Sequence, residues 1–550
     1  MSNKFELGME KCAANFQALT PLRLLDRAAD IFPTRTAVIF KERKYSWAQY
    51  ADRCRRLARG LIAQGVVPGD TVSIIASNIP AMLEAQFGVP LSGAVLNCIN
   101  IRLDAAAMAF ILQHSETRVL LVDQQFADVA QEAIALSGLE IKVVDIRDDD
   151  LPDAGTAGNV EYEQFLDSAP EDLELRYPSD EWDAIALNYT SGTTGNPKGV
   201  VYHHRGAYLN ALGTALYAKL NARNPVYLWT LPLFHCNGWC FAWALAAVAG
   251  TSVCLRKVVA EDVYAAIEAH GVTHLCGAPT VLGFLISGKP KHWTKPETPI
   301  YIGCAGASPP SGILREIQEL GFDLLHVYGM TEQHGVNTMC EPQDHWDQMP
   351  VQERLAHQGR QGVRSVVSDQ MIVADPVSCQ PVPRDGKTLG EVMFRGNLGM
   401  KGYLKNPDAT REAFLNGWHH SGDLAVLHDD GYIEIKDRIK DIIISGGENV
   451  SSLEVEEVLS THPAVAGSAV VAVPDPKWGE VVCAVVELRP EHVGTLSEAE
   501  IVQFCRTKLP GFKSPRHVIF EPLVRTATGK LQKFRLRSRA AEVIANRARE

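Results

Sequence analysis

The positions of hydrophobic and polar residues along the chain predict strands that alternate with helices. Leucines and alanines recur at helical spacing over residues 21–33, and a second amphipathic helix is expected over 47–64, after a short strand at 37–40. Further apolar runs predict strands at 71–76, 94–97, 119–122, 184–189, 200–202, 274–279, 301–307 and 324–328. Strands that alternate with helices in this way imply a parallel sheet with helices on both faces.

The stretch 228–255 is nearly uncharged and is long enough to be considered as a membrane span, which needs about 20 apolar residues. Pro232, His235, Asn237 and two glycines interrupt it, and its last residues have the composition of a strand. We therefore expect a buried strand, loop, helix and strand, and no insertion into a membrane.

The second half of the chain has a different pattern. From Gly390 onward the segments are short, β-rich and separated by glycine turns, and the run Asp437–Asp441 precedes an extended segment and the turn Gly446-Gly447. A chain of 550 residues is too long for one core. We place a domain boundary near Lys440, with a large domain at 1–439 and a small helix–strand–strand–helix unit at 440–550.

Net charge and the pattern of cysteines indicate which classes of partner and which location to expect. The net charge of −12 argues against a general binder of nucleic acid or anionic membranes, although residues 501–550 hold 12 Lys/Arg against 3 Asp/Glu. That basic end is equally consistent with an anionic ligand and with a solvated helix. The twelve cysteines are scattered without a C-x-x-C pair, and the N-terminus lacks the apolar core of a signal peptide. We expect reduced thiols and a cytoplasmic location.

One polar stretch carries the strongest chemical signal. Residues 189–200 read YTSGTTGNPKGV, in which glycines permit turns that aim backbone N–H groups at one point and Lys198 adds a full charge. Such a loop suits an oligophosphate. It is not a Walker A loop, because Pro197 stands where that motif requires glycine, and the following Val200-Val201-Tyr202 favours a strand over a helix.

This loop closely resembles the phosphate loop of the adenylate-forming superfamily, which includes acyl-CoA synthetases, luciferases and peptide-synthetase adenylation domains. Four further motifs match that family in order: YGMTE at 328–332, WHHSGD at 418–423, Asp437-Arg438 and TATGK at 526–530. The strings FHCNGW and SGGENVSSLEVE are similar to those of medium-chain acyl-CoA synthetases, bacterial 3-methylmercaptopropionyl-CoA ligases and plant short-chain or benzoate-activating enzymes. The resemblance implies an α/β fold: a large N-terminal domain with parallel sheets flanked by helices plus a β-rich subdomain, and a small mobile α+β C-terminal domain.

The resemblance also implies ATP, Mg²⁺ and CoA as partners of the site. Glu332 and Thr190 would hold Mg²⁺ through hard oxygen atoms, Thr331 would donate to the α-phosphate, and Asp423 with Arg438 would bind the ribose hydroxyls. The remaining nucleotide contacts would come from the phosphate loop and two strand ends: Thr190, Ser191, Gly192, Thr193, Thr194, Gly195, Lys198, Gly306, Ala307, Ser308, His326, Val327, Tyr328 and Gly329.

Lys530 resembles the lysine that joins the substrate carboxylate to a phosphate oxygen, a task that suits a compact, flexible cation. The residue that is usually proline in this loop is Val524 here. Lys440 would be the pivot between the domains, and Gly446 and Gly447 would line the CoA tunnel. By the same resemblance, the acyl pocket would be formed by His235, Trp239, Gly303, Ala305 and Gly306. The candidate catalytic residues are Lys530, Thr331, Glu332 and His235.

The expected function is that of an AMP-forming acid–CoA ligase acting on a short- or medium-chain acid, including 3-methylmercaptopropionate. An adenylation enzyme that loads a carrier protein or another acceptor remains an alternative, as does a non-catalytic acyl-nucleotide sensor. The presence of Lys530 and Glu332 opposes the sensor, and the failed Walker match opposes a motor ATPase. A homodimer is compatible with the family.

Overall fold

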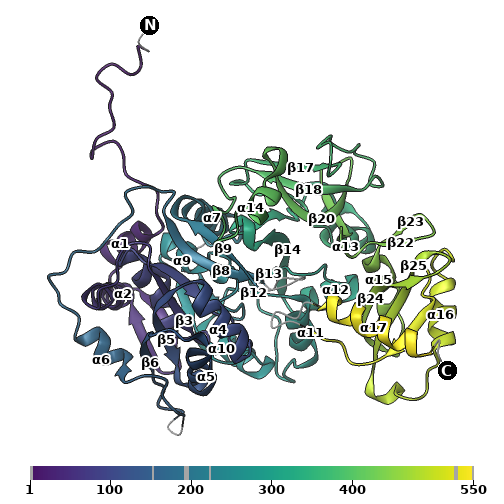
Figure 1. The fold of residues 1–550 in the computed structure, drawn as a ribbon, viewed down its shortest axis with the longest axis horizontal. Helices are drawn as coiled ribbons and strands as arrows, with labels where there is room; N and C mark the ends of the chain where they lie inside the picture. The colour runs from purple at the N-terminus through teal and green to yellow at the C-terminus, as the bar shows by residue number, and fades with distance from the viewer. Residues whose placement is uncertain (1–3, 152–153, 191–196, 222–223, 526–530, 548–550) are drawn as a thin grey trace.

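The computed structural model describes residues 4–151, 154–190, 197–221, 224–525 and 531–547. It is an α/β protein in which the N-terminal part holds two large sheets and the C-terminal unit lies at the opposite end (Figure 1). The N-terminal part of the segment that precedes α1 extends away from the body in the same view. None of the described helices is both long and apolar enough to cross a bilayer.

The first large sheet has eight strands, in spatial order β19 (Gly402–Tyr403), β9 (Lys198–His203), β8 (Ala184–Thr190), β4 (Val95–Cys98), β3 (Thr71–Ile75), β5 (Thr117–Asp123), β6 (Lys142–Ile146) and β7 (Val160–Glu161). The strands from β8 to β7 pair in parallel, whereas β8–β9 and β9–β19 are antiparallel. Every residue of β3 is buried, as a strand covered on both faces requires.

The second large sheet has nine strands, in the order β16 (Val363–Arg364), β15 (Gly335–Met339), β14 (Phe322–Met330), β13 (Ile300–Cys304), β12 (His274–Gly277), β10 (Val226–Leu228), β11 (Thr251–Val253), β1 (Thr36–Phe40) and β2 (Arg43–Ser46). Its interior is parallel, and antiparallel strands occupy both edges. Parallel strands place their carboxyl ends at one edge, so the segments that follow β13 and β14 lie side by side.

Helices cover these two sheets: α1 (Leu22–Ile31), α2 (Trp47–Ala63), α3 (Pro80–Leu91), α4 (Ala105–His114), α5 (Ala127–Ser137), α6 (Tyr162–Asp167), α7 (His204–Tyr217), α8 (Cys236–Trp239), α9 (Phe241–Val248), α10 (Ala260–His270), α11 (Pro279–Ser287), α12 (Ser311–Glu319) and α13 (Val351–Gln358). The largest apolar cluster joins α1, α2, α3, α7 and α9 to strands of both sheets. Stretch 228–255 forms the end of β10, α8, α9 and β11, as the interruptions in its apolar pattern predict.

A smaller antiparallel sheet forms the β-rich region after residue 365: β17 (Gln370–Ala374), β18 (Gly390–Arg395), β20 (His419–Leu427) and β21 (Ile433–Arg438), with α14 (Pro407–Ala413) beside it. The C-terminal unit contains β22 (Ile443–Ser445), β23 (Glu448–Val450), α15 (Ser452–Ser460), β24 (Val465–Asp475), β25 (Gly479–Leu488), α16 (Glu498–Arg506), β26 (His517–Phe520) and α17 (Lys533–Arg547). Two apolar clusters lie wholly within it.

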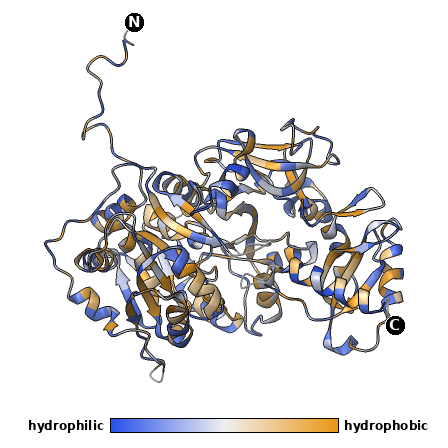
Figure 2. Cartoon of the chain, viewed as in Figure 1, coloured by the Kyte–Doolittle hydropathy of each residue, from blue (hydrophilic) through white to orange (hydrophobic). Residues whose placement is uncertain are grey.

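Figure 2 shows hydrophobic residues concentrated on the strands of each unit, with hydrophilic residues on the outer helical faces. The predicted α/β class, with mainly parallel sheets, a β-rich subdomain and a small C-terminal unit, is confirmed. The C-terminal unit contains more elements than the predicted helix–strand–strand–helix motif. The extended segment before Gly446-Gly447 is confirmed as β22, whereas β23 and β26 were missed because they are short. Pairing with β25 stabilises β22 and β26.

Candidate active site

The phosphate loop closes an antiparallel hairpin. Thr190, the last residue of β8, pairs with Lys198, the first residue of β9. The Thr190 hydroxyl donates to the Lys198 carbonyl at 3.5 Å. The predicted loop residues Ser191, Gly192, Thr193, Thr194 and Gly195 lie outside the described residues. The strand that continues through His203 confirms that this loop does not open a helix.

Glu332 follows β14 in a short 3₁₀ turn, Thr331–Gln333, and its carboxylate lies next to the hairpin. The hydroxyl of Tyr403 donates to Glu332 Oε1 at 2.9 Å. The Lys198 ammonium lies 4.8 Å from the centroid of the same tyrosine ring. The structure therefore brings Lys198 and Glu332 together around Tyr403, a residue that the sequence interpretation missed because a tyrosine after glycine carries no specific chemical signal.

The residues present fit a magnesium ion. Glu332 and Thr190 offer a carboxylate and a hydroxyl, the hard oxygen donors that Mg²⁺ prefers. Within the described ranges, no group of three or more His, Cys, Asp or Glu forms a metal-binding cage.

The predicted ribose site is assembled from two sheets. Asp423 of β20 and Arg438 of β21 are direct cross-strand partners, and Arg438 Nε lies 3.4 Å from Asp423 Oδ1. The Tyr328 hydroxyl, which comes from β14, donates to Asp423 Oδ2 at 2.7 Å. Burial, followed by the neighbouring Asp423 charge, raises the pKa of Tyr328 well above its ordinary value, so its hydroxyl remains a donor.

Glu391 supports the turn that carries Asp423 and was also missed. Its buried carboxylate accepts from the Gly422 N–H at 2.8 Å and contacts His420 Nδ1 at 2.7 Å. Gly422 has φ 73°, a left-handed conformation that favours glycine. Only the folded sheet brings Glu391 to this turn, across the β18–β20 pairing.

The segments predicted to flank the nucleotide base lie at the ends of neighbouring parallel strands. Gly306, Ala307 and Ser308 follow β13, and the Ser308 hydroxyl accepts from Gln361 Nε2 at 2.6 Å. Val327 is buried in β14. The ring of His326 is also buried; its Nδ1 lies 2.9 Å from the Gly359 carbonyl, and burial lowers its pKa to about 4. The His326 side chain is therefore part of the buried core.

Gly329, also in β14, is needed for backbone packing. A Cβ at this position would lie 1.7 Å from the Gly335 carbonyl oxygen, so no other residue fits without separating β14 from β15. The same strand pair fixes Tyr328 and the turn with Thr331.

The turn expected to border the acyl pocket has left-handed backbone at Cys236, Asn237 and Trp239, with φ of 47°, 43° and 51°. Asn237 N–H donates to Asn188 Oδ1 at 3.2 Å, which ties the turn to β8. Cys236 Sγ lies 3.1 Å from Thr331 Oγ1, so the turn meets the predicted phosphate-binding threonine.

The walls of this region are close-packed. Trp239 is only 7% exposed, and its backbone Cα would lie 3.6 Å from a Cβ placed on Gly335. A Cβ on Gly303 would lie 2.8 Å from Cys276 Sγ. Ala305 is buried at the end of the same strand, and His235 immediately precedes the turn.

The C-terminal residues of the predicted site surround the junction between the units. Burial and the charges of Arg438 and Lys198 lower the pKa of Lys440, while Arg537 of α17 donates to the Lys440 carbonyl at 3.1 Å. Gly446 and Gly447 form the β22–β23 turn with positive φ. Lys530 lies outside the described residues; the flanking Arg525 and Leu531 pair with each other.

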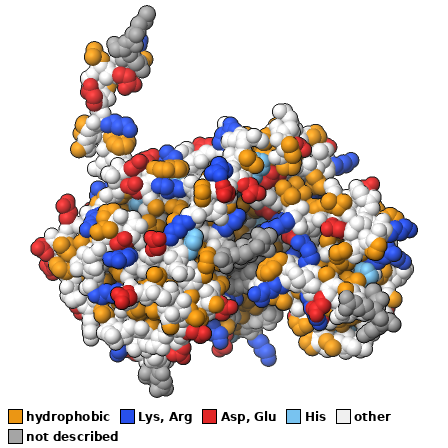
Figure 3. All heavy atoms as spheres, in the orientation of Figure 1, with side chains coloured by type: hydrophobic (Ala, Val, Ile, Leu, Met, Phe, Trp, Pro, Cys, Tyr) orange, Lys and Arg blue, Asp and Glu red, His pale blue; other side chains and the backbone are white. Residues whose placement is uncertain are grey.

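Val524, which replaces the usual proline, precedes the segment that carries Lys530 and is bonded to a residue that follows it. Its carbonyl accepts from the Gln532 N–H at 2.9 Å. Lys and Arg side chains are visible across the C-terminal unit in Figure 3, in line with the basic composition of the last fifty residues.

Comparison with known proteins agrees with this geometry. The model of the AMP-binding enzyme family matches residues 25–404, and that of the AMP-binding enzyme C-terminal domain matches 454–530. The chain belongs to the AMP-binding enzyme family. An acetate/butyrate–CoA ligase of Arabidopsis thaliana is 49% identical to it, and an acetate–CoA ligase of Humulus lupulus is 48% identical, each covering 97% of both chains.

The structure of o-succinylbenzoate CoA synthetase from Bacillus subtilis, in complex with an acyl-adenylate intermediate, has a TM-score of 0.80 and 28% identity to this family member. The alignment covers 93% of this chain and 97% of that one. The same enzyme has also been solved with ATP and a magnesium ion, with a TM-score of 0.78. The resemblance to adenylate-forming enzymes is therefore confirmed.

The expected cytoplasmic location is contradicted. The Arabidopsis acetate/butyrate–CoA ligase is named as peroxisomal, and so are a butyrate–CoA ligase and a trans-cinnamate:CoA ligase among the other relatives. The prediction was wrong because peroxisomal and cytoplasmic proteins share composition and thiol usage. Import into peroxisomes depends on a short address read by a receptor, which charge and hydropathy do not reveal.

Proposed function

We propose that this AMP-binding enzyme activates a short- or medium-chain carboxylic acid with ATP and transfers the acyl group to CoA. The class of acid–thiol ligase, with ATP and CoA as co-substrates, is confirmed by the family and by its ligase relatives. The identity of the acid, including 3-methylmercaptopropionate, and the roles of single residues belong to the proposal.

The observation that carries the proposal is the convergence of charged groups from separate segments beside β14. Arg438 and Asp423 lie at one end of Tyr328, and Lys198 and Glu332 lie around Tyr403. A carboxylate and a polyphosphate repel each other, by about 4 kcal/mol per charge pair at 4 Å and an effective dielectric near 20. Lys198 and the expected Lys530 would offset this repulsion, while Mg²⁺ bound by Glu332 and Thr190 would neutralise phosphate charge.

In the first half-reaction, a carboxylate oxygen attacks the α-phosphorus, the bond to the β-phosphate oxygen breaks, and pyrophosphate leaves. Thr331 would donate to the α-phosphate, and Lys530 would join the two anions during attack. In the second, the CoA sulfur attacks the acyl carbon and AMP leaves. The buried Trp239 side chain would limit the length of the acyl chain, which favours short acids.

The test is a product assay with ATP, Mg²⁺, CoA and a panel of acids from two to eight carbons, including aromatic and sulfur-containing members. We expect AMP, pyrophosphate and the acyl thioester in equal amounts. Stoichiometric ADP would contradict the proposal. Adenylate that forms without consuming CoA would favour the carrier-protein alternative, and nucleotide binding without any turnover would favour the sensor.

A further inference from the structure

Tyr403 lies between two charged residues that the proposed function assigns to the triphosphate. Its strand, β19, pairs with β9 so that Tyr403 is opposite Val200. Lys198, two residues before Val200, therefore shares a sheet face with Tyr403 and is its diagonal neighbour. On its other side, the chain of β19 is tied to the turn after β14, because Met400 N–H donates to the Glu332 carbonyl at 2.9 Å.

The side chain of Tyr403 contacts both charges through different groups. Its hydroxyl donates to Glu332 Oε1 at 2.9 Å, and its ring lies 4.8 Å from the Lys198 ammonium, within the range of a cation–π interaction. Neither Lys198 nor Glu332 forms an ion pair with any residue in the described part of the chain.

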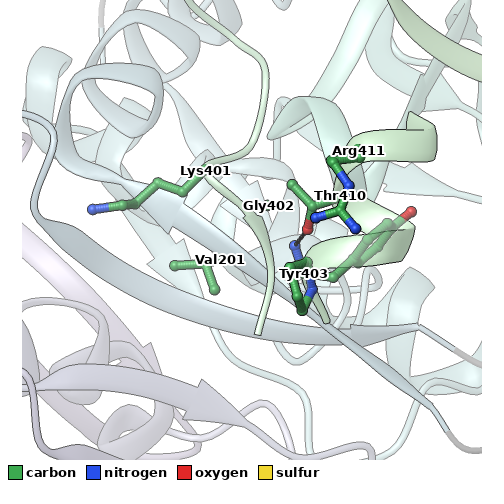
Figure 4. A pocket seen from close by; sticks show the side chains of 7 residues that line it. Val201, Lys401, Gly402, Tyr403, Thr410 and Arg411 are labelled. Carbon is green, nitrogen blue, oxygen red and sulfur yellow. Dashed lines mark hydrogen bonds between the residues drawn. The ribbon is translucent and has the colours of Figure 1, made fainter. Parts of the chain in front are cut away.

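The backbone around Tyr403 is fixed independently of these contacts. The Tyr403 N–H donates to Thr410 Oγ1 at 2.9 Å, which links β19 to α14 beside a surface hollow of about 380 Å³ (Figure 4). A Cβ on Gly402 would lie 2.8 Å from the Thr410 methyl group, so the approach of these two segments requires glycine. These contacts hold the backbone of Tyr403 in place, so that its side chain lies against Lys198 and Glu332.

We propose that Tyr403 is the positioning residue of the triphosphate site: it holds Glu332 for the metal ion and Lys198 for the phosphates, and keeps them from pairing with each other. The inference rests on the proposed function, because it takes the roles of Lys198 and Glu332 from there. With Oε1 bound to the tyrosine, Oε2 would be the oxygen left to hold a metal ion. Hydrogen bonds to a metal-binding carboxylate typically change metal affinity 10- to 100-fold.

Two substitutions separate the contributions of the hydroxyl and the ring. Tyr403→Phe removes the hydrogen bond to Glu332 and retains the face presented to Lys198, whereas Tyr403→Leu removes both. Equilibrium ATP binding to the full chain is measured by calorimetry, with Mg²⁺ and with EDTA. We expect Tyr403→Phe to weaken ATP binding about tenfold with Mg²⁺ and leave it unchanged in EDTA. Tyr403→Leu should also weaken binding in EDTA, about threefold.

A double-mutant cycle with Glu332→Gln tests whether the hydroxyl acts through the carboxylate. In the Glu332→Gln background, Tyr403→Phe should cause no further loss of Mg²⁺-dependent affinity. Tyr177 provides a matched control, because its hydroxyl donates to Asp26 Oδ2 at 2.7 Å and its ring lies 3.7 Å from Arg23, beside α1. Tyr177→Phe should leave ATP affinity unchanged under both conditions.

Unchanged Mg²⁺-dependent affinity in Tyr403→Phe would overturn the inference, as would full additivity with Glu332→Gln. An equal loss with Mg²⁺ and with EDTA would also overturn it, since that pattern reports general damage to the site. Failure of the proposed function is distinguished by the wild-type chain, which would then bind no ATP or form no AMP.

Discussion

Trp239 is the residue whose position bears most directly on the choice of acid. It lies at the end of the left-handed turn after His235, and its carbonyl accepts from the Thr214 hydroxyl at 3.5 Å. Trp239 is buried, and its Cα and Cβ lie next to Gly335, which follows the predicted phosphate-binding turn. A large side chain fixed at this point would limit the length of an acyl chain that enters from the nucleotide side.

Trp239→Gly should therefore shift the preference of the enzyme toward longer acids. Each methylene newly accommodated is worth about 0.8 kcal/mol of burial, roughly a fourfold gain in kcat/KM. The measurement is kcat/KM for straight-chain acids of two to eight carbons. As a control, Trp346→Gly removes a buried tryptophan that packs against Tyr432 and should lower stability without altering the chain-length profile. The same profile in both variants would show that Trp239 does not cap the pocket.

Among the elements, the β14–β15 pair organises the site because it carries Tyr328 and leads into the turn with Thr331 and Glu332. Its close approach depends on Gly329, whose missing side chain leaves room for the Gly335 carbonyl. A methyl group there would force the strands apart and displace the Tyr328 hydroxyl from Asp423.

Gly329→Ala should lower the free energy of unfolding by on the order of 4 kcal/mol, as for other severe backbone clashes, and weaken ATP binding. Gly312 provides the matched control, because a Cβ there meets nothing within 4 Å and the residue lies in α12. Gly312→Ala should be neutral or stabilising by up to about 1 kcal/mol. Thermal unfolding and ATP titration of both variants check this prediction; equal behaviour would contradict the proposed role of Gly329.

For the whole molecule, the division near residue 440 stays a prediction, and the junction gives it a physical basis. Arg537 of α17 bonds to the Lys440 carbonyl and pairs with Asp441 at 2.8 Å, so the helix that follows the Lys530 segment contacts the expected pivot. Rotation at Lys440 would withdraw Lys530 after adenylation and bring Gly446 and Gly447 to the CoA tunnel.

Variants at Lys530 and Lys440 should then separate the two half-reactions. Lys530→Ala should slow adenylation by about 10²–10³-fold, the effect of losing one electrostatic stabiliser, yet still convert preformed acyl-adenylate to thioester. Lys440→Pro restricts φ to near −65° and should impair the thioester step more than adenylation. Pyrophosphate release and thioester formation are measured separately, with Lys508→Ala as a control on the exposed basic surface. Equal losses in both steps for both variants would exclude domain alternation.

Buried histidines make the stability of the folded protein depend on pH. Burial lowers the pKa to about 4 or about 3 in each of His203, His204, His274, His326, His334 and His419. In the unfolded chain these groups bind protons near pH 6.5. Their contribution to stability is therefore complete above pH 6.5 and is lost progressively as the pH falls toward 4.

The melting temperature should accordingly fall between pH 7.5 and 5.5, a range in which most carboxylates remain ionised. His326→Gln should reduce this pH dependence, because the amide can still donate to the Gly359 carbonyl but does not titrate. Each histidine should contribute about 1.3 kcal/mol to the difference in the free energy of unfolding between pH 7.5 and 5.5. A melting temperature that is constant over this range would contradict the assignment of neutral, buried rings.

The sequence alone determined the features whose chemistry is local. The order of serine, threonine and glycine before Lys198 predicts a phosphate loop, and the proline and β-branched residues around it argue against a helix. The spacing of apolar residues and the local composition also located most strands of the parallel sheets, because burial on both faces requires long apolar runs. The family motifs named Glu332, Asp423 and Arg438 because each motif is contiguous.

Only the tertiary structure decided which residues support those motifs. Tyr403 reaches Glu332 and Lys198, and Glu391 reaches Gly422, through contacts between segments that are distant in sequence. The buried position of the His326 ring likewise depends on a contact with Gly359, which directly follows α13. Strand pairing brings such groups within hydrogen-bonding distance, and a pattern along one segment contains no information about the partner that lies across the sheet.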